Sequence, residues 1–156
     1  MRRHFVESFL AAELWGPAPE GRELRVLDVG SGGGFPGLAG RIRRQDVAMT
    51  CLEPRAAKAA FLSKVASGLP GAPTRVLTRR IEEFHVEQPF DVVTFRALAV
   101  EIGQIERILA PSGRIVGFPG GEETWSRAVV EAGWRPLESR ELSDGGRQVV
   151  AWARTH

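Results

Sequence analysis

Short apolar runs and longer segments with apolar residues three or four positions apart follow one another along this chain. The short runs predict strands, and they cover Leu24 to Val29, Ala48 to Glu53, Thr74 to Leu77, Phe90 to Phe95 and Arg114 to Phe118. The longer segments predict helices, which we place after Pro36, over Arg55 to Gly68, around Ile102 to Leu109 and over Glu122 to Ala132. Repeated strand–helix units form a mostly parallel sheet with helices on both faces. The pattern therefore predicts a doubly wound α/β chain.

Two of the predicted helices carry a clear apolar side. The segment Arg2 to Leu14 is amphipathic, with apolar residues at Phe5, Phe9 and Ala12. The segment Arg55 to Gly68 also presents one apolar side, formed by Ala57, Phe61 and Val65. Because amphipathic helices bury their apolar side, we expect both helices to pack through these residues.

The last part of the chain departs from the strand–helix alternation. Two strands, Arg135 to Leu142 and Gln148 to Ala153, face each other across a turn that contains Asp144 and Gly145. An Asp-Gly turn between two such runs predicts a hairpin, so the last strand is expected to enter the sheet antiparallel. Dehydrogenase domains keep their strands parallel. A doubly wound, mostly parallel sheet with an antiparallel C-terminal hairpin strand is instead the arrangement of Rossmann-like class I methyltransferases.

Composition adds limits on partners and organisation. The 156 residues, 43% hydrophobic and 26% charged, fit one ordinary globular domain, and helix breakers separate an N-terminal helix and linker (1–21) from the main domain (22–156). No apolar run could span a membrane and no signal core is present, so we expect a cytoplasmic protein. A single cysteine, Cys51, is expected to be a buried small hydrophobe. We expect no metal site and a monomer.

The strongest chemical pattern is LDVGSGGGFPG, from Leu27 to Gly37. It follows a predicted strand and precedes a helix, the context in which a glycine loop binds a ligand. Gly30, Gly32 and Gly34 let the backbone turn sharply and approach a ligand closely. The alternative is a purely structural turn.

Two cofactors are candidates for this loop, a nicotinamide dinucleotide and S-adenosyl-L-methionine. A dinucleotide loop has its third glycine three residues after the second, where Phe35 stands. The alternating Gly30, Gly32 and Gly34 favour S-adenosyl-L-methionine, and Phe35 can then form a wall of the donor pocket.

Residues at three further strand ends fit such a donor. Glu53 ends the second strand, where a carboxylate can accept hydrogen bonds from both ribose hydroxyls; the alternative is an exposed strand-end acid. Ile81 and Glu82 follow the third strand, where an adenine would lie against an apolar side chain. Arg96 follows the fourth strand and can pair with the donor carboxylate or with a substrate phosphate.

Six segments of the chain resemble, in order, those of the RsmG (GidB) family: RRHFVES, LDVGSGGGFPGL, LEPRAAKAAFL, RRIEEF, FDVVTFRALA and GGRQVVAWA. This family consists of bacterial small-subunit ribosomal RNA guanine-N7 methyltransferases. The resemblance implies donor contacts at Gly30, Phe35, Ile81, Glu82 and Arg96. It also implies that the substrate is a guanine of 16S ribosomal RNA, free or in the small ribosomal subunit.

The chain departs from the family pattern at two places. Family members carry a longer helical region before the Arg-His pair, and residues 1–21 would be its remnant. The family also tends to have lysine and glycine after the fifth strand, where this chain has Phe118, Pro119, Gly120 and Gly121.

Methylation of guanine N7 needs no general base, because this nitrogen carries a lone pair and no proton. Positioning can supply the catalysis, so we expect no catalytic acid or base. Basic residues near the predicted strand ends are candidates for RNA phosphate contacts: Arg55, Lys58, Arg79, Arg80 and Arg96. The alternatives are a small-molecule methyltransferase, which would need an enclosing lid, and a non-catalytic donor-binding module.

Overall fold

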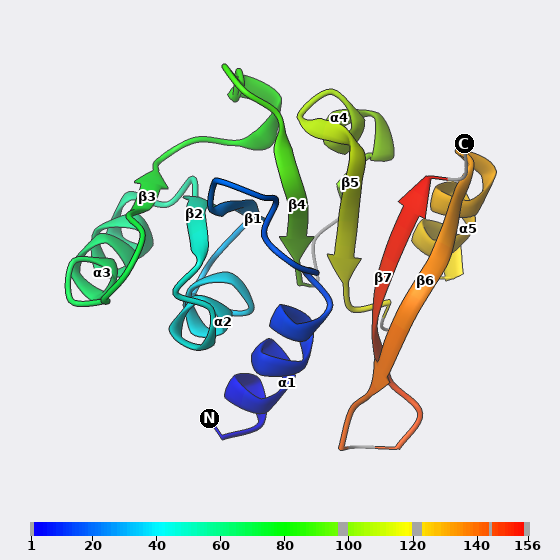
Figure 1. Ribbon diagram of the computed structural model, residues 1–156, viewed down its shortest axis with the longest axis horizontal. Helices are drawn as coiled ribbons and strands as arrows, with labels where there is room; N and C mark the ends of the chain where they lie inside the picture. The colour runs from blue at the N-terminus through cyan, green and yellow to red at the C-terminus, as the bar shows by residue number, and fades with distance from the viewer. Residues whose placement is uncertain (1, 97–99, 120–122, 144, 155–156) are drawn as a thin grey trace.

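The computed structural model describes residues 2–96, 100–119, 123–143 and 145–154. Over these residues, seven strands form one sheet in the order β3-β2-β1-β4-β5-β7-β6 (Figure 1). The strands are β1 (Leu24–Val29), β2 (Val47–Leu52), β3 (Thr74–Leu77), β4 (Phe90–Phe95), β5 (Leu109–Gly117), β6 (Trp134–Glu141) and β7 (Gln148–Arg154). The helices are α1 (Arg2–Glu13), α2 (Gly37–Arg43), α3 (Ala56–Ala66), a 3-10 turn η1 (Ile81–Glu83), α4 (Ile102–Glu106) and α5 (Glu123–Glu131).

The sheet is parallel except at its C-terminal hairpin. Strands β1 to β5 pair in parallel, whereas β7 is antiparallel to both β5 and β6. In Figure 1 the arrowheads of β4 and β5 point down and that of β7 points up. The predicted doubly wound sheet with an antiparallel hairpin strand is therefore confirmed. Asp144 of the predicted turn and Glu122 at the predicted helix start lie outside the described residues.

Two apolar clusters lie on opposite faces of the sheet. Side chains alternate along a strand, so Val26 of β1 joins the cluster with Leu38 of α2 and Leu62 of α3. The next residue, Leu27, joins the other cluster, with Ile105 of α4. The sheet is thus covered on both faces, as a doubly wound fold requires.

The N-terminal helix packs into the first of these clusters. Ala11, Ala12, Leu14 and Trp15 are buried there, and Gly40 of α2 provides the space for the Trp15 ring. A Cβ at Gly40 would lie 2.7 Å from Cη2 of Trp15. Residues at the end of α1 therefore share one core with the sheet. The expected apolar side is confirmed at Ala12, while Phe5 and Phe9 are only half-buried.

The predicted apolar side of α3 is confirmed at Val65, which packs against the first cluster, and is wrong at its other two residues. Phe61 is 53% exposed and Ala57 is also exposed, whereas Ala59 and Leu62 are the buried residues of this helix. Leu62 packs where Gly34 approaches α3, since a Cβ at Gly34 would lie 3.4 Å from Cδ2 of Leu62. The buried side of α3 is therefore the side that carries Leu62, which packs against the glycine loop and the first cluster.

The predicted helix around Leu109 is too long. Helix α4 ends at Glu106, and Leu109 already belongs to β5, opposite Phe90 of β4. The register shifts before the next pair, Val92 with Arg114. A Cβ at Gly113 would lie 2.5 Å from Cγ of Leu109, so the intervening segment folds back on itself as a bulge within the strand.

Candidate functional site

The carboxyl ends of β1, β2 and β4 meet at one edge of the sheet. Val29 pairs with Leu52 on one side and with Phe95 on the other, so the residues that follow these strands come together. Ligands of open α/β sheets bind at this edge.

The glycine loop leaves β1 as a tight turn over β2. The N–H groups of Gly30 and Ser31 both donate to the carbonyl oxygen of Leu52, at 2.9 and 3.0 Å. Gly30 and Gly32 have φ values of 69° and 53°, a region that favours glycine. Gly34, with φ of 93°, also has a backbone conformation that favours glycine, and a Cβ there would lie 3.3 Å from the Cβ of Leu38.

Glu53 holds the loop from the end of β2. Its Oε2 accepts a hydrogen bond from the N–H of Gly32 at 2.8 Å, and its Oε1 accepts one from the N–H of Arg55 at 2.9 Å. The side chain is buried, so the alternative of an exposed strand-end acid is wrong. A carboxylate has about four acceptor positions, and two remain for a ligand.

Asp28 lies beneath the same loop. It is fully buried, and neither carboxylate oxygen has a hydrogen-bond partner among the described residues. Burial, with a smaller effect of the nearby Glu53 carboxylate, raises the pKa of Asp28 to about 7. A Cβ at Gly37 would overlap with the Asp28 carboxylate, which explains the glycine at the start of α2. Asp28 is thus packed under the loop.

A hollow of about 160 Å³ lies beside the loop. Of the predicted donor residues, Gly30, Ile81 and Glu82 line it, and so does Arg80. The apolar part of the lining comes from Val29, Leu52, Pro54, Ile81 and Val100. The structure therefore brings the loop, η1 and the end of β2 around one cavity. The chemistry of this lining suits an adenosine group, because an apolar wall faces a loop whose backbone has no Cβ at Gly30.

Phe35 lies on the side of the loop that faces α1. Its ring contacts Phe5 edge-on, with centroids 5.0 Å apart, and His4 with centroids 5.5 Å apart. Among the described residues, the lining of the hollow does not include Phe35. The position of Phe35 as a donor contact stays a prediction.

Arg96 also points to α1, where it forms an ion pair with Glu7 and lies over the ring of Phe118 at 5.1 Å. Glu7 is 1% exposed and accepts further hydrogen bonds from Arg3 and Arg147. Burial acts to raise the pKa of Glu7, but hydrogen bonds from Arg3 and Arg96 outweigh it and hold the pKa below its ordinary value.

Sequence reasoning missed Glu7 and Arg147. The spacing of Arg3 and Glu7 is that of a surface ion pair on a helix, so the pattern gives no sign that Glu7 is buried. Arg147 follows the glycines of the hairpin turn, where a basic residue usually lies in solvent. Its partner is 140 positions away.

The other candidate RNA contacts are exposed at the same edge. Arg55 and Lys58 lie at the start of α3, and Arg79 and Arg80 lie between β3 and η1. Arg79 and Arg80 both line the hollow, next to Pro54. Gly120 and Gly121, which stand where the family tends to be basic, lie outside the described residues.

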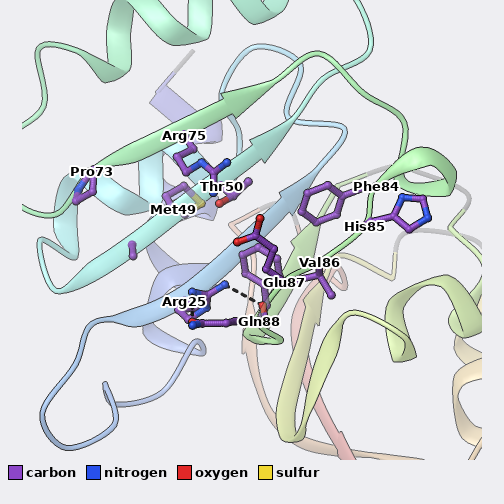
Figure 2. Close-up of a pocket in the computed structure, with 12 residues that line it drawn as sticks. Arg25, Met49, Thr50, Pro73, Arg75, Phe84, His85, Val86, Glu87 and Gln88 are labelled. Atoms are coloured by element: carbon purple, nitrogen blue, oxygen red, sulfur yellow. Dashed lines mark hydrogen bonds between the residues drawn. The ribbon is translucent and has the colours of Figure 1, made fainter.

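A second hollow, of about 300 Å³, lies elsewhere on the sheet (Figure 2). Arg25 of β1, Thr50 of β2 and Arg75 of β3 line it together with the segment 84–88. Figure 2 shows Arg25 reaching Gln88, to which it donates hydrogen bonds at 3.0 and 2.8 Å. No residue predicted to bind the donor or RNA lines this hollow, so the smaller one at the loop is the candidate site.

Two features are absent from the described residues. None of their helices is both long and apolar enough to cross a membrane. They also contain no cluster of His, Cys, Asp or Glu side chains suited to a metal ion.

Comparison with solved structures defines the class of fold. The structure of the ribosomal protein L11 methylase from Lactobacillus delbrueckii subsp. bulgaricus matches with a TM-score of 0.74 at 16% sequence identity, over 100% of this chain and 81% of that one. The fold is that of the Rossmann-like methyltransferases, with the glycine loop at the carboxyl edge of the sheet.

Sequence comparison then identifies the family. The model of the GidB family, described as rRNA small subunit methyltransferase G, matches residues 1–121. The relative from Roseiflexus sp. (strain RS-1) is 38% identical over 120 residues, covering 74% of this chain and 49% of its own length. The relative from Leptothrix cholodnii is 38% identical over 159 residues, covering 97% and 72%. Both are named Ribosomal RNA small subunit methyltransferase G. The chain belongs to the GidB family, and it spans about half the length of the Roseiflexus relative.

Proposed function

We propose that this chain is an S-adenosyl-L-methionine-dependent methyltransferase that methylates N7 of a guanine in 16S ribosomal RNA. The observation that carries the proposal is a GidB-family glycine loop beside a hollow lined by Gly30, Ile81 and Glu82. The names of the relatives support ribosomal RNA as the substrate. We propose that it acts as a monomer in the cytoplasm, where ribosomal subunits are modified.

The residues at the hollow would hold the donor as follows. Ile81 and Val100 pack against the adenine, and Glu82 contacts its polar edge. Glu53 is buried next to the lining residues Leu52 and Pro54 and does not itself line the hollow; its remaining acceptor positions would meet the ribose hydroxyls. The turn at Gly30 and Gly32 lets the backbone lie close to the donor. When bound, the donor supplies an electrophilic methyl group.

No side chain has to remove a proton in this reaction, because guanine N7 has an available lone pair. The protein contributes by holding the guanine in line with the methyl group and excluding water from it. Basic residues along the edge, Arg55, Lys58 and Arg80, would bind the RNA backbone.

The test uses small ribosomal subunits and free 16S RNA from a strain that lacks this protein. Incubation with labelled donor should introduce label at one guanine, which chemical cleavage at N7-methylguanine then locates. Calorimetry in parallel should find binding of S-adenosylhomocysteine and none of NAD. Labelling of a small molecule but of neither RNA substrate would favour the small-molecule methyltransferase. Donor binding without any transfer would favour the non-catalytic module.

A further inference from the structure

A row of aromatic rings runs from the glycine loop along α1. Phe35 of the loop contacts Phe5 edge-on, with ring centroids 5.0 Å apart, and Phe5 contacts Phe9 one helical turn further on, with centroids 6.2 Å apart. The ring of His4 also contacts Phe35, at 5.5 Å. These four rings form the aromatic row. At its far end, the guanidinium of Arg43 on α2 lies over the ring of Phe9, at 5.2 Å.

The aromatic row lies outside the apolar core. Neither of the two clusters on the sheet includes Phe5, Phe9 or Phe35, and α1 is held in the core by its C-terminal half. The three phenylalanines are half-buried, and the His4 side chain is 49% exposed. The row is therefore a partly open aromatic surface that begins at the donor loop.

Arg43 is held by this surface while its hydrogen-bond donors stay available. The residue is exposed, and among the described residues its guanidinium has neither a hydrogen bond nor an ion pair. A guanidinium that stacks on a ring keeps its N–H groups directed outward in its own plane. Because these groups match the geometry of phosphate oxygens, Arg43 is suited to bind a phosphate at the end of the row.

The charges around the row also favour an anionic partner. Glu7 of α1 is 1% exposed and is bound by arginines. Glu13, one turn beyond Phe9, is the other acidic residue of α1 and pairs with Arg140 at 3.6 Å. Helix α2 (Gly37–Arg43) contains no acidic residue. Open rings beside an unpaired arginine are the kind of surface that binds single-stranded RNA, with bases on the rings and phosphates on the cation.

We propose that the aromatic row stacks unpaired bases of the RNA strand that carries the target guanine, and that Arg43 binds a phosphate of this strand. The proposal rests on the proposed function, because it requires RNA as the substrate. Gly30 of the glycine loop lines the hollow, so a strand on the row has one end beside the donor. Phe35 lies where the two sites meet and keeps its predicted contact with the donor.

The test compares two ligands, a single-stranded RNA oligonucleotide and an abasic strand of the same length, which keeps the phosphates and lacks the bases. Phe9→Leu should weaken RNA binding roughly five- to tenfold and binding of the abasic strand by no more than about twofold, because stacking needs a base. Arg43→Gln should weaken binding of both strands, because both carry phosphates. If Phe9→Leu fails to fold, Arg43→Gln still decides whether this surface binds RNA.

Two matched controls carry the same substitutions away from the row. Phe61→Leu removes another phenylalanine, 53% exposed on α3, and Arg75→Gln removes an exposed arginine of the edge strand β3. Each should lower RNA affinity less than the same substitution in the row does. The Kd of S-adenosylhomocysteine, measured by calorimetry, should stay within about twofold of the wild-type value in all of these variants.

Four results would overturn the role of the row. They are unchanged RNA affinity in Phe9→Leu and Arg43→Gln, equal losses of the RNA and the abasic strand in Phe9→Leu, an equal loss in Phe61→Leu, or self-association in sedimentation that Phe9→Leu abolishes without weakening RNA binding. The last would show that a second copy of the chain covers the row. All four leave the proposed function intact as long as the wild-type protein methylates 16S RNA or the small subunit. A wild-type protein that binds donor but no RNA would overturn the proposed function, and the role of the row with it.

Discussion

The two buried carboxylates at the glycine loop, Asp28 and Glu53, differ in the hydrogen bonds that they accept. Glu53 accepts two backbone hydrogen bonds, while neither oxygen of Asp28 has a partner among the described residues. Glu53 therefore stabilises the loop through two hydrogen bonds, whereas burial raises the pKa of Asp28 and favours its protonated form.

Glu53→Ala should lower the stability of the ligand-free protein as well as its donor affinity. Without the carboxylate, the N–H groups of Gly32 and Arg55 lose their acceptor, at a cost of about 1–3 kcal/mol. Urea denaturation measures this loss. Glu82→Ala is the matched control: Glu82 also lines the hollow but is exposed, so its removal should reduce donor affinity and leave the free energy of unfolding nearly unchanged. Equal stability of the two variants would contradict the role of Glu53 in the loop.

Asp28 should make the protein less stable as the pH rises. Its pKa is about 7 in the folded protein against an ordinary value of 3.8, so between these values the folded state binds a proton that the unfolded chain has released. The free energy of unfolding then falls with pH, by roughly 2–3 kcal/mol between pH 5 and pH 8 from this group. Asp28→Asn removes this contribution.

Urea denaturation of both proteins at the two pH values tests this prediction. The wild-type protein should lose stability relative to Asp28→Asn on going from pH 5 to pH 8, because the folded-state carboxyl releases its proton over this range. Parallel pH curves for the two proteins would show that Asp28 does not titrate in this range.

At the scale of helices and strands, periodicity indicates that an element exists. It does not indicate which side of the element is buried. Helix α3 offers two apolar stripes, one through Phe61 and one through Leu62. Packing of Leu62 in the sheet cluster, with Gly34 close to it, selects the second stripe, and these contacts are not local. Leu109 has helical spacing from Ile105, yet pairing with β4 places it in a strand.

The same limit applies to the site. The loop at Gly30 and the hollow at Ile81 follow from local patterns, because strand ends of a parallel sheet meet at one edge. The ion pair of Arg96 with Glu7 does not follow from a local pattern, because it joins residues 89 positions apart. Strand order and helix packing decide it.

Two helical glycines should respond in opposite ways to alanine. A Cβ at Gly40 would meet the Trp15 ring at 2.7 Å, whereas one at Gly103 of α4 would have no neighbour within 4 Å. Gly40→Ala should therefore destabilise the protein by about 1–3 kcal/mol through overpacking. Gly103→Ala should stabilise it by about 0.5–1 kcal/mol, because alanine loses less backbone entropy in a helix. Thermal denaturation measures both, and a stabilising Gly40→Ala would show that α1 does not pack on α2 as described.

At the scale of the whole molecule, the net charge of +2 says little about RNA binding, and the distribution of charge says more. Exposed basic residues lie along the carboxyl edge of the sheet, around the hollow. A polyanion that contacts this edge releases bound counterions, so its affinity should fall steeply with salt.

Reversal of charge at the start of α3 should weaken RNA binding selectively. Arg55→Glu with Lys58→Glu should reduce the slope of log K against log salt by about 1–2 and leave donor affinity unchanged. Acidic residues favour the first turn of a helix, so the variant should fold. Fluorescence anisotropy over a salt series provides the measurement.

Lys64→Glu is the control for this variant, because Lys64 is an exposed lysine in the last turn of the same helix. It should change the salt slope less than the double variant does. Equal effects at both ends of α3 would mean that RNA binds without preference for the carboxyl edge.

The bond between Glu7 and Arg147 has a consequence for the order in which this protein matures on the ribosome. Helix α1 is made before the sheet, but the partner on the hairpin is made 140 residues later, and β7 must still insert between β5 and β6. Contacts of such long sequence separation form only after loop closure over nearly the whole chain. A nascent chain can therefore assemble the glycine loop and the hollow well before synthesis ends, while the cluster around Glu7 is completed only after the last strand has emerged.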